Sequence, residues 1–99
     1  MSDVNNTVSE EKLDKYFSIT EEALDKVKAS DIDEERKAEA EDFLDMAERY
    51  YSDAGHFREK GDWVLAFAAL NYAHGWLDAG ARLGFWDIDK KVKDYFVVD

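Results

Sequence analysis

Apolar residues recur at steps of three and four along most of the chain, which is the period of a helix with one buried face. In the first segment the residues at this spacing are Leu13, Tyr16, Phe17, Thr20, Leu24 and Val27. In the second segment they are Ala40, Phe43, Leu44, Ala47, Tyr50, Tyr51, Ala54 and Phe57. The chain has no proline to interrupt such runs. We therefore predict helices over about 8–29 and 33–60.

Turn and cap residues mark where these predicted helices begin and end. Thr7 and Glu10 have the spacing of a capping box at the start of the first helix, and the connector "SDID" supplies cap residues for the second. Gly61 permits a tight turn, and Asp62 can cap the helix that follows. Gly84 is a candidate for the end of that helix. We predict a third helix over about 62–83, which forms an antiparallel hairpin with the second.

The third helix is apolar on two opposite faces. Residues 63–86 carry only two formal charges, on Asp78 and Arg82. One face consists of Trp63, Ala66, Phe67, Leu70, Ala73, Leu77 and Ala81, and the opposite face of Val64, Leu65, Ala68, Tyr72, Gly75, Trp76, Ala79 and Leu83. Two neighbouring helices cover only about half of a helix, so the second face needs a further cover.

We therefore predict an all-α fold: a three-helix bundle in one domain over residues 1–99, with a short C-terminal segment over 85–99. The candidate interface residues on the second face are Trp76, Tyr72, Ala68, Gly75, Ala79 and Leu83. The expected occupant is a second copy of the chain, which would make a homodimer, or another helical protein. Val92 and Phe96 of the C-terminal segment are an alternative cover within the same chain.

The charge balance narrows the class of partner. The formal net charge is −11 and the pI is about 4.5, so the surface repels phosphate backbones and anionic lipids. We expect no nucleic acid and no membrane as partner. The chain has no cysteine, and its N-terminus lacks the apolar run of a signal peptide. These features predict a cytoplasmic protein.

A polar group beside the core suggests a second class of function. Antiparallel pairing places His74 opposite Glu48, with Tyr51 one turn away and Asp78 four residues along its own helix. Such a group suits an enzyme, or a protein that binds a nucleotide or another small ligand in a pocket between helices. The simpler interpretation is a buried histidine that satisfies polar groups where two helices meet. We favour the interaction module, and expect no catalytic residue, no metal site and no cofactor.

The second half of the chain resembles a known family. The runs "YYSDAGHF", "KGD" and "AFAALNYAHGWLDAGARLGFWD" are similar to the domain of unknown function family 357, a set of short archaeal proteins. Residues 1–40 resemble the family only in being acidic and helical. The resemblance implies a small, all-helical, cytoplasmic protein of archaeal origin. It implies no activity, because none is assigned to the family.

Overall fold

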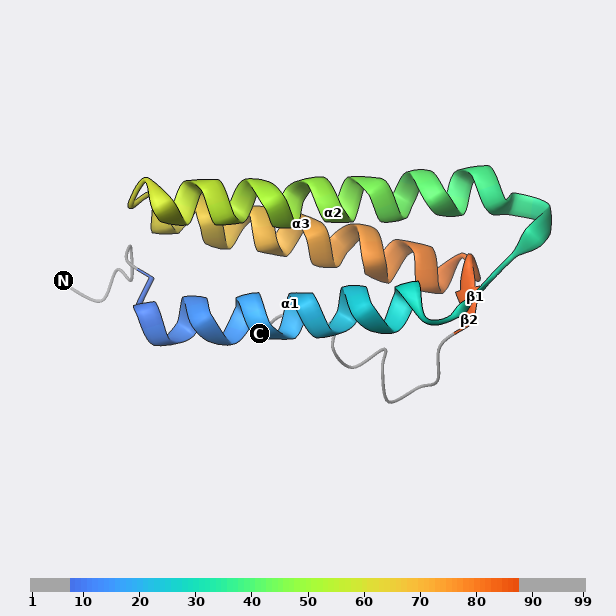
Figure 1. The fold of residues 1–99 in the computed structure, drawn as a ribbon, viewed down its shortest axis with the longest axis horizontal. Coiled ribbons are helices and arrows are strands. Elements are labelled where there is room, and N and C mark those ends of the chain that lie inside the picture. The colour runs from blue at the N-terminus through green and yellow to red at the C-terminus, as the bar shows by residue number, and fades with distance from the viewer. Residues whose placement is uncertain (1–7, 88–99) are drawn as a thin grey trace, which may run out of the picture.

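The chain folds into three long helices, α1 (Glu10–Lys28), α2 (Lys37–Glu59) and α3 (Trp63–Arg82). This computed structural model describes residues 8–87. Figure 1 shows the helices side by side along the long axis, with the chain direction reversing at each connection. Helices α2 and α3 form the most extensive pairing, and α1 packs mainly against α3. The predicted all-α bundle with its antiparallel hairpin is confirmed.

The helices are slightly shorter than predicted. Helix α1 begins at Glu10 because Ser9 caps it, its hydroxyl accepting a bond from the backbone N–H of Lys12 at 3.1 Å. Thr7 of the predicted capping box lies outside the described residues. Helix α2 begins at Lys37 and not at residue 33, because a short 3₁₀ turn, η1 (Glu34–Arg36), precedes it with Asp33 as its cap. The 3₁₀ turn breaks the α-helical hydrogen-bond pattern there.

Two glycines end the last two helices in the same way. Gly61 and Gly84 have positive φ values of 83° and 77°, which an L side chain rarely adopts. After each glycine the backbone N–H reaches back across the last turn, from Asp62 to Phe57 O at 2.8 Å and from Phe85 to Gly80 O at 2.9 Å. These are Schellman endings. The turn expected at Gly61 and the helix end expected at Gly84 are therefore both present.

A short antiparallel pair of strands, which the sequence pattern did not predict, closes one end of the bundle. Strand β1 (Asp31–Ile32) pairs with β2 (Trp86–Asp87), with Ile32 opposite Trp86. The two strands appear beside each other at one end of the bundle in Figure 1. The backbone N–H of Asp33 adds a bond to Phe85 O at 2.8 Å. This pairing holds Trp86, which is almost fully buried, against the last turns of α3.

The core consists of two apolar clusters arranged along the bundle. The cluster at the strand end contains Ala23, Leu24, Val27, Ala40, Ala47, Leu77, Ala81, Phe85 and Trp86. The cluster at the hairpin end contains Leu13, Tyr16, Ala54, Ala66, Ala69 and Leu70. Thr20 and His74 are also buried, each between residues of the two clusters on its own helix.

Candidate functional site: the outer face of α3

Helix α3 has a buried inner face and an exposed outer face. The inner face, toward α1 and α2, is fully or almost fully buried at Ala66, Ala69, Leu70, Ala73, Leu77 and Ala81. We call the opposite surface the outer face; it consists of Val64, Leu65, Ala68, Tyr72, Gly75, Ala79 and Leu83. Within residues 8–87, the exposed large hydrophobic side chains are Val64 (56% exposed), Leu65 (50%), Tyr72 (61%) and Leu83 (49%). All of them lie on α3 or on its cap residue.

The structure places the six predicted interface residues at two levels of burial. Tyr72, Gly75 and Leu83 are exposed, while Ala68, Ala79 and Trp76 are half-buried. Trp76 packs edge-on against Phe43 of α2, with the ring centres 4.9 Å apart. It therefore borders the outer face and partly joins the core. Val64 and Leu65 belong to this face as strongly as the six, although the candidate set omitted them.

A shallow apolar groove runs beside the outer face, where α3 meets α2. It has a volume of about 230 Å³ and is lined by Tyr50, Asp53, Phe57, Leu65, Ala68, Ala69 and Tyr72. The Tyr72 ring stacks on Tyr50 with centres 5.2 Å apart and planes 22° apart, and it still remains mostly exposed. The groove thus extends the apolar surface of α3 onto α2.

His74 is close-packed inside the bundle and only 1% exposed. Its Nε2 lies 2.7 Å from the hydroxyl of Thr20, which itself donates to the carbonyl of Tyr16 at 2.8 Å. Because the hydroxyl hydrogen is used there, Thr20 accepts from Nε2–H, and Nδ1 is the unprotonated nitrogen. That Nδ1 is buried and has no hydrogen-bond partner among the described residues. Burial lowers the pKa of His74 from its ordinary value.

The other residues of the predicted polar pocket have partners of their own. Glu48 forms an ion pair with Lys28 of α1 at 2.9 Å, and Asp78 pairs with Arg82 at 2.9 Å. The Tyr51 hydroxyl donates to Glu21 at 3.0 Å; burial and that carboxylate raise its pKa to about 12. Each of these groups therefore bonds to a residue other than His74.

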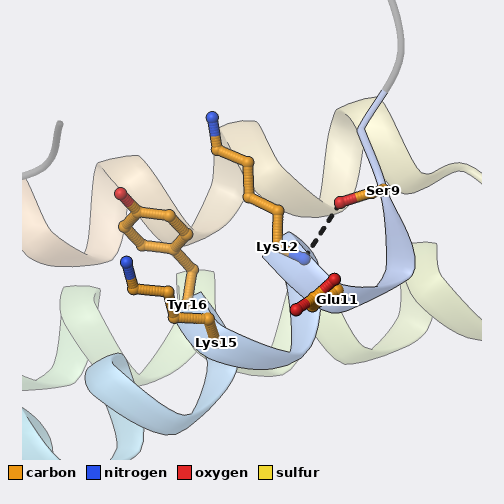
Figure 2. Close-up of a pocket in the computed structure, with 5 residues that line it drawn as sticks. All are labelled: Ser9, Glu11, Lys12, Lys15 and Tyr16. Carbon is orange, nitrogen blue, oxygen red and sulfur yellow. Dashed lines mark hydrogen bonds between the residues drawn. The ribbon is translucent and has the colours of Figure 1, made fainter.

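A second depression lies at the start of α1 and was not predicted. It has a volume of about 450 Å³ and is lined by Ser9, Glu11, Lys12, Lys15 and Tyr16. Figure 2 shows these residues on the first turns of the helix, with the bond from Lys12 N to Ser9. Lys12 lies over the Phe67 ring and Lys15 over the Tyr16 ring. Its serine is thus occupied as a helix cap and its lysines rest on aromatic rings.

Within residues 8–87 the chain presents neither a cluster of metal ligands nor a helix that could span a membrane. Between residues 8 and 87, His, Asp and Glu side chains form no group of three or more that would suit a metal ion. None of the three described helices combines the length and the apolar character that a membrane span requires.

Within residues 8–87, fold and surface together define a small all-α bundle with one exposed apolar helix face. The family model described as "Protein of unknown function (DUF357)" matches residues 15–86, which is most of the chain. The chain belongs to this family. The match contains most of α1, from residue 15 onward, as well as α2, α3 and the outer face, so it extends beyond the resemblance seen from residue 50 onward. The chain matches no curated protein and no solved structure.

Proposed function

We propose that this chain is a protein-interaction module whose binding surface is the outer face of α3. The observation that carries the proposal is the distribution of exposed large hydrophobic residues. Single exposed apolar side chains are normal on any protein surface. Here Val64, Leu65, Tyr72 and Leu83 follow one helix, with small residues between them. A continuous apolar strip of this kind is typical of a surface that another protein covers.

The energetics support the same proposal. Burying a large apolar side chain completely contributes about 1.5–3 kcal/mol to stability. The four exposed residues of the outer face, Val64, Leu65, Tyr72 and Leu83, each still have about half of their surface exposed. A partner that covered the four would thus gain several kcal/mol. Within residues 8–87, the chain's own packing leaves that contribution unused.

The small-ligand pocket around His74 has less support. A ligand or substrate would need to reach the imidazole, but the ring is enclosed between Thr20 and the two core clusters. Glu48, Tyr51 and Asp78 form their bonds with other residues. A hydrogen-bonded core histidine accounts for this geometry without catalysis.

The proposal is tested by introducing a charge on the outer face with Ala79→Glu. Ser52→Glu is the matched control, because it adds the same charge at an exposed position on α2. The tagged wild-type chain in an extract of its native cell should elute above the mass of the monomer, and so should Ser52→Glu. Ala79→Glu should elute as the monomer, because a desolvated and unpaired carboxylate costs several kcal/mol. Equal elution of all three chains would overturn the proposal.

A further inference from the structure

We propose that the partner of the outer face is a second copy of this chain, packed antiparallel about a two-fold axis that passes between residues 73 and 74 of each α3. This inference rests on the proposed function and names its partner. In such a symmetric interface the same surface meets itself, so each residue pair occurs twice. The residues of one helix must therefore be complementary to the same residues read in reverse.

The spacing of the outer face has this property. Its central line consists of Val64, Ala68, Tyr72, Gly75, Ala79 and Leu83, at steps of four, four, three, four and four residues. The steps are the same in both chain directions, and the midpoint lies between residues 73 and 74. Between its ends the line is about 28 Å long at a rise of 1.5 Å per residue. An antiparallel copy can thus place each of these positions at the level of another.

The side-chain sizes are complementary in the same register. Tyr72 of one copy lies at the level of Gly75 of the other, and Ala68 lies at the level of Ala79. A Cβ atom added at Gly75 would meet nothing within 4 Å, so the space above this glycine is open. The partner's Tyr72, whose ring stacks on Tyr50 of its own chain and stays mostly exposed, lies at this level, and the alanines let the two backbones approach closely. Leu83 lies at the level of the partner's Val64, and Leu65, beside the central line, lies at the level of the partner's Arg82.

A parallel arrangement loses this fit. It would place Tyr72 against Tyr72 and Gly75 against Gly75, which leaves a collision at one level and a gap at another. It would also place Arg82 of one copy near Arg82 of the other. The antiparallel arrangement separates these arginines and opposes the two helix dipoles. The geometry therefore favours the two-fold antiparallel pair.

Charge does not oppose the contact locally. Asp78 and Arg82, the charged residues of α3, pair with each other at 2.9 Å within one chain. Two outer faces can thus meet without burying an unpaired charge. The net charge of −11 on each copy acts over a longer range and weakens the pair. We expect a dimer that dissociates on dilution.

The first test fills the space above Gly75. Gly75→Gln places a side chain where the single chain has room, so the monomer should keep its fold. Gly55→Gln is the matched control, because Gly55 is also in a helix and its added Cβ also meets nothing within 4 Å. In sedimentation equilibrium, the wild type and Gly55→Gln should dimerise, and Gly75→Gln should have at least tenfold weaker association. Equal association of both variants would overturn the inference.

The second test determines the register, and it uses the absence of cysteine from the chain. Ala68→Cys and Ala79→Cys are made as separate proteins, then oxidised alone and as a mixture. The antiparallel pair predicts a disulfide between the two variants in the mixture and almost none in either protein alone, since like positions lie about 17 Å apart along the axis. Disulfides within each single variant would contradict the register. No disulfide in any sample would contradict the second copy.

Failure of this inference can be separated from failure of the proposed function. A pure wild-type monomer at every concentration, together with a complex in extract that Ala79→Glu removes, means a foreign partner; the function then stands and the second copy fails. If Ala79→Glu instead lowers the melting temperature of a monomer, a segment of the same chain covers the face. In that case both fail.

Discussion

The two faces of α3 are equally apolar in sequence but differ in what they contact. The inner face combines small residues with Leu70 and Leu77, both fully buried, so α3 lies close to its two neighbours. The outer face carries Leu65 and Tyr72 at half exposure or more. Hydrophobicity alone therefore does not identify core positions on this helix; the direction relative to α1 and α2 does.

The largest difference is expected between two leucines. Leu70→Ala should destabilise the fold by about 2–5 kcal/mol, because the residue is fully buried and leaves a cavity. Leu65→Ala should change stability by about 0.5 kcal/mol or less in the monomer, as at other surface positions. Urea unfolding of dilute samples measures both. Similar losses for the two variants would mean that the chain itself covers Leu65.

Two glycines provide a smaller comparison of opposite sign. A Cβ at Gly80 would lie 2.1 Å from the Trp86 ring, and β2 holds that ring in place. Gly80→Ala should therefore destabilise the fold by about 1–3 kcal/mol through overpacking.

Gly75→Ala adds the same methyl group on the outer face, where nothing lies within 4 Å. It should stabilise the monomer by about 0.5–1 kcal/mol, because alanine favours a helix more than glycine does. Thermal melts of both variants at low concentration measure the two changes. A gain in stability for Gly80→Ala would show that Trp86 is not seated against α3.

The buried histidine predicts a pH dependence of stability. Burial lowers the pKa of His74 in the folded state below the ordinary 6.5, so the unfolded chain binds more protons as the pH falls below that value. The contribution of His74 to the free energy of unfolding should therefore fall on acidification, by at most about 1.4 kcal/mol per pH unit. Urea unfolding of the wild type and of His74→Gln should show the steeper loss in the wild type. Equal pH slopes would contradict the prediction.

The smallest effect expected is that of salt on association. Raising the ionic strength from about 0.01 M to about 0.15 M shortens the screening length from about 30 Å to about 8 Å. Because each copy carries a net charge of −11, salt should strengthen the dimer severalfold in light scattering. Weaker association in salt would indicate that attraction between opposite charges holds the interface.

The sequence was sufficient to predict the helical part of the fold. The spacing from Leu13 to Val27 identified the buried line of α1, and Gly61 and Gly84 marked the ends of α2 and α3. The strand pair was not predictable in the same way, since two residues per strand give no periodicity. The close approach of Trp86 to Gly80 depends on that pairing and was missed with it.

The candidate sites were predictable to different degrees. The outer face followed from the two apolar faces of α3, because a bundle of three leaves one of them free. To predict the polar pocket, one would need to know the direction in which each side chain points around its helix, as well as its position along the helix axis. Glu48 was expected opposite His74, yet its carboxylate reaches Lys28, while His74 faces Thr20. The helical period and the antiparallel pairing determine the position of each residue along the bundle axis. They did not determine which of the two neighbouring helices a side chain contacts.

The most direct test of self-association through α3 is the molar mass of the pure wild-type chain in light scattering over a range of concentrations. If two copies pair through α3, the mass should rise with concentration from 11.4 kDa toward twice that value. Gly75→Gln should need at least a tenfold higher concentration to reach the same mass. A wild-type mass of 11.4 kDa at every concentration and salt level would contradict the second copy as the partner of α3.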